Sequence, residues 1–245
     1  MTRKQYFSSG LKDGMPICFG YFAVSFAFGI QAAGIGLSVF EASVLSALNV
    51  TSAGQFAALA IIASGASLIE LAFTQLIINL RYFLMSCALS QKLSPGLPLG
   101  HRLGIAYGMT DEIFAVSVSQ REPLSPFYSY GLIAVAIPGW VLGTALGAAA
   151  GNILPAVLTN ALGIAIYGMF IAIILPPAKE NRVVAGVVVL SMVLSALFTY
   201  LPVLCNISSG FRIIVITLIT AGGAALLFPI PDEPAEPEKE MPHES

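Results

Sequence analysis

Charged residues are scarce in this chain of 245 residues. Only 10% of the residues are Asp, Glu, Lys or Arg, against about 25% in an ordinary soluble domain, and residues 123–178 and 183–211 contain none. A soluble surface cannot be built from so few charges. The mean hydropathy of +0.86 and the hydrophobic content of 57% instead predict an all-α polytopic membrane protein, because each helical crossing needs about 20 apolar residues.

Cysteine and histidine are also rare. Cys18, Cys87 and Cys205 lie in apolar surroundings without the paired spacing of a zinc site or a disulfide framework, and the two histidines, His101 and His243, form no cluster. The chain has no Gly-x-x-x-x-Gly-Lys-Ser/Thr loop, so ATP is not its direct energy source. With no catalytic dyad visible either, we expect no enzyme, no metal, no cofactor and no nucleic-acid partner.

Apolar runs separated by Gly, Pro and charge predict about eight transmembrane helices, with seven as the lower count. Their ranges are 16–36, 40–63, 67–90, 104–120, 126–151, 156–176, 183–202 and 210–230. The segment 104–120 is short and polar, so we expect a broken helix there. If it crosses, the side of both termini holds seven Lys and Arg residues, and the other side holds Lys92, Arg102 and Arg212. Because cytoplasmic loops carry the excess of Lys and Arg, we predict that 104–120 crosses and that both termini are cytoplasmic.

The chain divides into one transmembrane domain, residues 1–230, and an acidic tail. The tail, residues 231–245, is rich in Pro and Glu, and we expect it to be disordered. Within the domain, residues 22–25 read Phe-Ala-Val-Ser, as do residues 114–117. This match favours an inverted repeat, an architecture common among secondary transporters; the alternative is chance, since the chain is rich in these residue types.

Arg81 lies inside an apolar stretch of membrane length, residues 67–90. An unpaired charge in such a place is costly, so an intramembrane ion usually marks a pathway or a binding site. Arginine stays charged, so Arg81 can hold a carboxylate through two hydrogen bonds but cannot shuttle protons. Asn79 and Tyr82 share a helical face and offer neutral hydrogen bonds there. The alternative is an arginine near the helix end whose side chain reaches a lipid headgroup.

Thr110, Asp111 and Glu112 follow Gly108 and precede a helical run. One interpretation is a helix start, with Thr110 as the N-cap and the acids at the positive end of the helix dipole. The other is a protonatable carboxylate in a pathway, paired with Arg81. The two are compatible, because a helix that begins inside the membrane is a usual place for a transporter's site. Asp111 and Glu112 point about 100° apart, so we expect at most one of them to face a cavity squarely.

Polar side chains also fall in the middle of the range 40–63. Asn49, Ser52 and Gln55 are spaced by three residues and share a helical face that could bind an amino or carboxylate group. Such residues equally often serve as hydrogen bonds between neighbouring helices.

Four glycines repeat at every fourth position after Pro138. They are Gly139, Gly143, Gly147 and Gly151. Small residues at this spacing let another helix approach closely. We therefore predict helix packing, rather than ligand binding, for this ridge and for the neighbouring Trp140.

Taken in order, five segments resemble the AzlC-like family of branched-chain amino acid exporters. They are residues 20–29, Ser-Ala-Gly-Gln-Phe at 52–56, Asn-Leu-Arg-Tyr at 79–82, Thr-Asp-Glu at 110–112, and residues 139–147. The resemblance covers roughly residues 8–230. It implies the large subunit of a two-component permease whose partner is a small hydrophobic AzlD-like membrane subunit. One departure is that residues 162–168 contain no acid, where the family often carries an Asp-Phe pair.

We therefore predict a permease of the bacterial plasma (inner) membrane that exports branched-chain or related neutral amino acids, coupled to protons through Asp111 or Glu112. A zwitterion's carboxylate can face a guanidinium or a helix N-terminus, and its ammonium can face a carboxylate or an amide oxygen. The candidate substrate-binding residues are Asn49, Ser52, Gln55, Asn79, Arg81 and Tyr82, and the candidate ion-coupling or helix-break residues are Thr110, Asp111 and Glu112. The alternatives are an exporter of another small amphiphile and a membrane scaffold subunit without a pathway.

Overall fold

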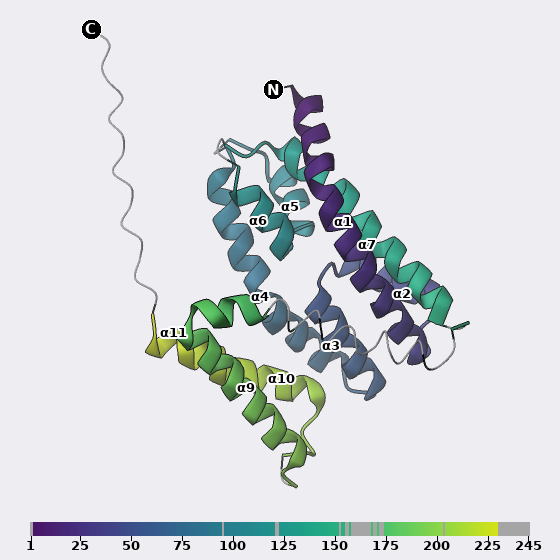
Figure 1. Ribbon diagram of the computed structural model, residues 1–245, viewed down its shortest axis with the longest axis vertical. Coiled ribbons are helices and arrows are strands. Elements are labelled where there is room, and N and C mark those ends of the chain that lie inside the picture. Colours follow the sequence, from purple (N-terminus) through teal and green to yellow (C-terminus); the bar gives the residue numbers. More distant parts are fainter. Residues whose placement is uncertain are drawn as a thin grey trace.

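The protein is built from helices throughout the part that the structure describes. The computed structural model describes residues 2–94, 96–120, 123–151, 153, 154, 157, 168, 171, 174–202 and 204–229. The elements are α1 (Arg3–Gly34), α2 (Val39–Leu48), α3 (Ser52–Ala63), α4 (Leu68–Lys92), α5 (Leu99–Tyr107), α6 (Asp111–Val118), α7 (Pro126–Gly151), α9 (Arg182–Tyr200), α10 (Ser209–Thr217), the π-helical turn η1 (Leu218–Gly222) and α11 (Gly223–Leu227) (Figure 1). These ranges contain no β-strand, only an isolated bridge between Leu93 and Leu124.

Five helical stretches in the described residues are long and apolar enough to cross a membrane. They are α1, α4, α7, α9 and the continuous run from Ser209 to Leu227. The prediction of an all-α polytopic membrane protein is therefore confirmed. Most of the predicted span 156–176, and the whole of the predicted tail 231–245, lie outside the described residues.

The first long helix and α7 are held together by small residues. The ridge Gly139, Gly143, Gly147 and Gly151 faces the backbone of Cys18, Phe22, Phe26 and Ile30, in that order. Because residue numbers rise together along both helices, α1 and α7 run parallel. A Cβ atom on Gly143 would lie 2.5 Å from the carbonyl oxygen of Phe22, so only glycine permits this spacing.

The predicted span 40–63 is not one helix but a hairpin of two. The chain breaks at residues 49–51 between α2 and α3. The start of α2 and the second half of α3 share one apolar cluster with the C-terminal ends of α1 and α7, made of Phe28, Ala32, Ala42, Leu59 and Ala148. At 1.5 Å per residue each arm is only about 15 to 18 Å long. The hairpin therefore enters the bundle to about half its depth and returns to the end where it started.

The predicted span 104–120 is a second hairpin, which confirms the expected break but not the expected crossing. Its turn lies at residues 108–110, between α5 and α6. At the start of α5, His101 Nδ1 lies 2.8 Å from Tyr130 Oη, and just after α6, Gln120 Nε2 donates to Tyr128 Oη at 3.0 Å. Both contacts are in the first turn or two of α7. This hairpin therefore enters from the end of the bundle opposite to α2 and α3, as Figure 1 shows.

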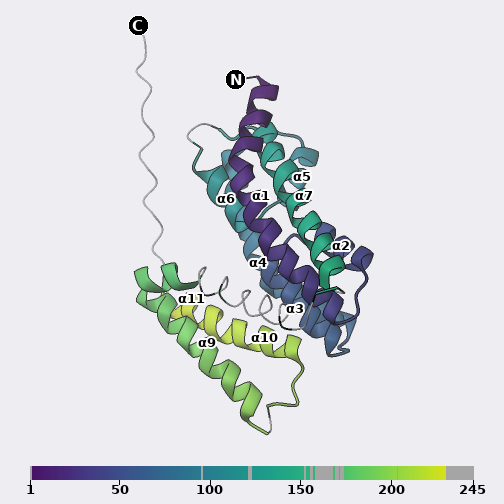
Figure 2. The same ribbon diagram turned by 45° about the vertical axis from the view of Figure 1, so that its right-hand side comes forward.

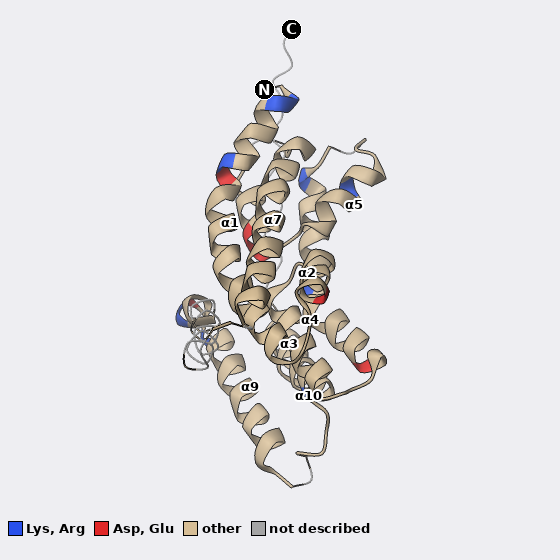
Figure 3. Cartoon of the chain, turned by 90° about the vertical axis from the view of Figure 1, so that its right-hand side faces the viewer, with Lys and Arg blue, Asp and Glu red and all other residues tan. Residues whose placement is uncertain are grey.

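The two hairpins change the predicted distribution of charge. The Arg3 guanidinium lies 5.2 Å from the centre of the Phe127 ring, and the His101 ring also packs on Phe127. Lys92, at the end of α4, bonds to the carbonyl oxygens of Val118 and Gln120. The prediction that Lys92 and Arg102 lie opposite to Arg3 is thus wrong, because neither hairpin crosses. Figure 3 shows several blue Lys and Arg segments in the half of the view that contains the N-terminus.

A hairpin followed by a long helix occurs twice in the chain. The first unit is α2, α3 and α4, and the second is α5, α6 and α7. Since α4 ends beside the start of α7, the two long helices point in opposite directions. The repeat predicted from residues 22–25 and 114–117 stays a prediction, because the first motif lies in the continuous α1 and the second in the short α6.

The C-terminal helices form a pair that packs against the start of α4. Figure 2 shows α9 and α10 side by side. The buried carboxylate of Glu70 accepts a hydrogen bond from the backbone N–H of Gly210 at 2.8 Å. A negative charge at the N-terminal end of α10 is stabilised by the helix dipole. This contact joins α10 to the bundle.

Candidate functional site

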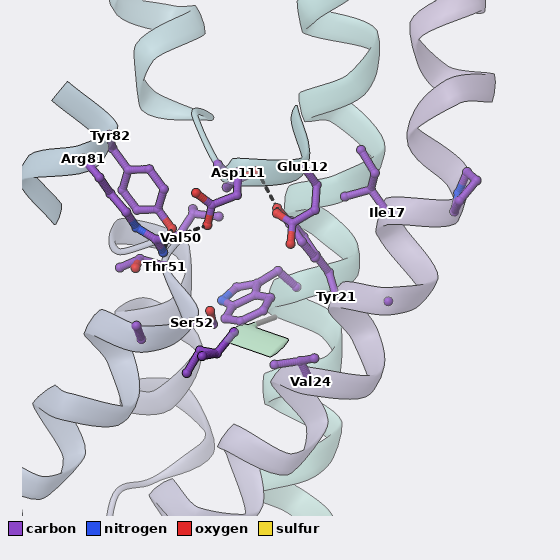
Figure 4. Close-up of a pocket in the computed structure, with 16 residues that line it drawn as sticks. Ile17, Tyr21, Val24, Val50, Thr51, Ser52, Arg81, Tyr82, Asp111 and Glu112 are labelled. Carbon is purple, nitrogen blue, oxygen red and sulfur yellow. Dashed lines mark hydrogen bonds and ion pairs between the residues drawn. The ribbon is translucent and has the colours of Figure 1, made fainter. Parts of the chain in front are cut away.

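A cavity of about 600 Å³ lies where the tips of the two hairpins meet. Its polar lining is Tyr21, Thr51, Ser52, Arg81, Tyr82, Thr110, Asp111 and Glu112 (Figure 4). Its apolar lining includes Ile17, Val24, Val50, Trp140 and Ile174. The volume is within the range of small-molecule sites in proteins, roughly 300 to 1,000 Å³.

Both hairpin tips place a threonine-capped helix start at this cavity. The Thr51 hydroxyl accepts from Gly54 N at 3.4 Å, and the Thr110 hydroxyl accepts from Ile113 N at 3.3 Å. The tips also touch, since the Tyr107 hydroxyl donates to the carbonyl oxygen of Ala47 at 2.5 Å. A helix start carries unpaired N–H groups and partial positive charge. The cavity therefore receives two such ends, from opposite directions.

The charges that the sequence singled out come together here. Arg81 Nη1 lies 2.8 Å from Asp111 Oδ2, which joins α4 to the tip of the second hairpin. The other guanidinium nitrogen donates to Tyr82 Oη at 3.0 Å. Both partners remain accessible, with side-chain exposures of 42% for Arg81 and 46% for Asp111. The pair is thus within reach of a ligand in the cavity.

Glu112 is turned to the other side of the cavity. The Tyr21 hydroxyl donates to Glu112 Oε2 at 2.6 Å and lies 2.5 Å from Thr110 Oγ1. Trp140 packs edge-on against the Tyr21 ring, with centroids 5.3 Å apart. Figure 4 shows Asp111 and Glu112 pointing in different directions from one tip. The sequence predicted that at most one acid faces the cavity squarely; both acids line it, on different sides.

The predicted substrate-binding residues fall into two groups. Ser52, Arg81 and Tyr82 line the cavity. Asn49 and Asn79 do not; each donates a side-chain hydrogen bond to Gln75 Oε1 at 3.1 Å, and Gln75 Nε2 donates to the carbonyl oxygen of Gly54 at 2.7 Å. These amides connect the first hairpin to α4 behind the cavity wall.

Gln55 is fully buried and also lies outside the cavity lining. Its Oε1 accepts from Trp140 Nε1 at 3.2 Å, and its Nε2 donates to Leu45 O at 3.2 Å and Ser46 Oγ at 3.1 Å. Ser46 is in turn hydrogen-bonded to Thr144 at 2.6 Å. Gln55 therefore ties the first hairpin to α7.

Sequence reasoning missed several residues of the site. Tyr21 and Gln75 lie in apolar helices where nothing in the local pattern separates them from packing residues. Trp140, predicted to pack, both packs on Tyr21 and lines the cavity. Thr51 had an available signal, because a threonine before Ser-Ala-Gly is a typical helix N-cap.

The described residues offer no set of ligands for a metal ion. No three His, Cys, Asp or Glu side chains lie close enough together there to hold an ion. The arrangement is instead suited to binding a small molecule with one charged end and one apolar end.

Comparison with known proteins gives three similarities. Residues 16–154 match the AzlC protein family. An uncharacterized membrane protein of Archaeoglobus fulgidus is 35% identical over 189 residues, which cover 76% of this chain and 83% of that protein. The inner membrane protein YgaZ of Escherichia coli is 31% identical over 184 residues, 72% of this chain and 75% of its own length. No solved structure matches the chain.

Proposed function

This chain belongs to the AzlC family of membrane proteins, and from that premise we propose that it is the large subunit of a two-component permease that exports leucine, isoleucine, valine or related neutral amino acids. The cavity at the hairpin tips carries this proposal. Its lining combines a cation, two acids and two helix starts with aliphatic and aromatic side chains. A neutral amino acid likewise combines a zwitterionic end with an apolar end.

The position of the cavity supports transport. Hairpins entering from opposite ends give a binding site near the midplane between two oppositely directed units, which is how many secondary transporters are built. A purely structural scaffold does not need a cavity of this size lined by ions. Proton coupling through Asp111 or Glu112 completes the proposal, because the chain has no nucleotide-binding loop.

The distribution of cations supports a cytoplasmic N-terminus. Arg3, Lys4, Lys12, Lys92 and Arg102 belong to one end of the bundle, around the start of α7 and the end of α4. No Lys or Arg occurs between Lys12 and Arg81, a range that includes the turns from α1 to α2 and from α3 to α4 at the opposite end; Arg212, at the start of α10, lies near that end. By the positive-inside rule, the cation-rich end faces the cytoplasm of the plasma membrane.

A broad apolar face on α4 is available to lipid and to the small AzlD-like partner. Its exposed side chains are Leu68, Ile69, Phe73, Leu76, Leu80, Phe83 and Leu84. A hydrophobic helix could pack there beside the wall that carries Arg81. The length of this face leaves room for both a partner helix and lipid.

Efflux from preloaded cells tests the proposal. Cells expressing the chain with its candidate partner should release labelled leucine, isoleucine, valine or methionine, and release should fall at least tenfold with Arg81→Gln. Lys4→Gln is the matched control, since it removes an exposed cation far from the cavity. Assembly of each variant with the partner is checked by co-purification. An assembled wild-type complex that exports none of the four would contradict the proposal and favour another amphiphile or a scaffold.

A further inference from the structure

The three charges that line the cavity do not cancel. Arg81 is engaged by Asp111 at 2.8 Å. Glu112 is hydrogen-bonded to the Tyr21 hydroxyl at 2.6 Å, and no Lys, Arg or His of the described residues lies within ion-pair distance of it. With both carboxylates ionised, the cavity therefore carries one negative charge in excess.

No neighbouring element in the described part of the chain supplies the missing positive charge. The charged and titratable groups that face Glu112 are Tyr21 from α1, Arg81 and Tyr82 from α4, and Asp111 from its own helix. From α7 comes Trp140, and from the tip of the first hairpin come Thr51 and Ser52, all uncharged. Glu112 is exposed to the cavity, and an unpaired carboxylate inside a membrane-spanning bundle is costly, so its counter-charge has to enter the cavity from solution.

We propose that a proton and the ammonium group of the substrate compete for the carboxylate of Glu112, while Asp111 serves as the fixed partner of Arg81. This inference rests on the proposed function. It gives different roles to Asp111 and Glu112, which the sequence did not distinguish. The protonated carboxyl group of Glu112 gives its proton to water, and the ammonium group then forms an ion pair with the carboxylate. Each substrate bound releases one proton, and each proton bound on the far side displaces one substrate.

Tyr21 is the positioning residue in this scheme. Its hydroxyl donates to the charged form of Glu112, and Thr110 and the Trp140 ring fix its position. Removing that hydrogen bond makes ionisation of Glu112 less favourable. Tyr21→Phe should therefore move the midpoint of any Glu112-linked pH profile to higher pH, while leaving the Arg81–Asp111 pair in place.

Calorimetry on the purified complex with its partner tests the inference, with leucine as the probe. In weakly buffered solution at a series of pH values, the wild-type complex should bind leucine with release of one proton at pH values below the midpoint. There its apparent Kd should rise about tenfold for each unit by which the pH is lowered, as one-proton linkage requires. Glu112→Gln should bind with no proton release and no such slope. Asp111→Asn should still release the proton, even where affinity falls. Glu41→Gln, an exposed cap acid, is the control and should match wild type.

The outcomes separate the inference from the function on which it rests. Proton release that persists in Glu112→Gln, or disappears in Asp111→Asn alone, overturns the inference. Leucine binding by the wild type without proton release does the same but leaves the proposed function intact. A wild-type complex that binds no branched-chain amino acid overturns both. If Glu112→Gln does not fold, Tyr21→Phe decides, since an unchanged midpoint contradicts the scheme.

Discussion

The two hairpins have the same build and opposite chemistry. Each has two short arms, a break at mid-depth and a threonine that caps the returning helix. The first turn of α3 contains no acid, whereas that of α6 contains Asp111 and Glu112. A repeated backbone arrangement thus presents neutral hydrogen-bond donors from one side and carboxylates from the other. Such a difference is what a zwitterion requires, because its two charges need unlike partners.

The hairpins are also anchored differently. The first is fixed to α7 by the amide of Gln55 and the Ser46–Thr144 hydrogen bond. The second is also held by hydrogen bonds to α7, between His101 and Tyr130 and from Gln120 to Tyr128, and its tip is joined to α4 by the ion pair of Asp111 with Arg81. The polar anchors of the first hairpin are therefore uncharged and buried, whereas those of the second include an ion pair at the cavity.

The largest expected effect comes from separating α1 from α7, the two long helices against which both hairpins pack. Gly143→Leu forces atoms into the backbone of α1 near Phe22, and overpacking at a rigid seam costs about 3 kcal/mol or more. We expect little folded complex by size-exclusion chromatography and loss of efflux. Gly186→Leu is the control, because a Cβ there meets no atom within 4 Å. A Gly143→Leu variant that folds and remains active would show that the close packing of α1 on α7 does not hold the two hairpin tips together.

A smaller effect should follow from moving an acid between the tips. Asp111→Ser leaves Arg81 without its carboxylate, and we expect at least a tenfold loss of efflux, since unpaired charge in this setting is costly. Adding Ser52→Asp restores an acid to the same cavity from the opposite tip and should recover part of the activity. Ser52→Asp alone is the control. A double variant no better than Asp111→Ser would mean that the tips are not interchangeable partners of Arg81.

The smallest effect concerns the two capping threonines. Thr51→Ala and Thr110→Ala each remove an N-cap hydrogen bond, worth about 1 kcal/mol. Because both hydroxyls are buried and both make one further side-chain contact, thermal unfolding of the complex should show similar losses. Thr51→Ser and Thr110→Ser keep the oxygen and should stay near wild type. Losses that differ by more than twofold would break the equivalence of the tips.

Sequence reasoning found the ionic centre because charge in an apolar chain is conspicuous. Arg81, Asp111 and the break at Thr110 could all be identified from local composition and helix-start chemistry. The helical class followed from hydropathy and the length of the apolar runs, and the glycine ridge from its four-residue spacing. These features depend on a residue and its near neighbours in sequence.

The parts that sequence reasoning missed depend on contacts between distant segments. A run such as 40–63 is long enough to cross a membrane, and only the packing of α2 and α3 against the ends of α1 and α7 shows that it turns back. Gln55 and Asn49 were expected at the site because they share a helical face with Ser52. The break at residues 49–51 takes Asn49 off that face, and Gln55, one turn beyond Ser52 in α3, is buried against α7. Only Ser52 of the three therefore lines the cavity.

The parallel seam between α1 and α7 imposes an order on biosynthesis. The glycine contacts join residues 10–30 to residues 131–151, so α1 leaves the ribosome well before the helix against which it packs. At roughly 5 to 20 residues per second, on the order of ten seconds of translation separate the two. During that interval the face of α1 that packs on α7 lacks its partner helix, so α1 has to stay in the membrane without its final contacts until α7 has been made.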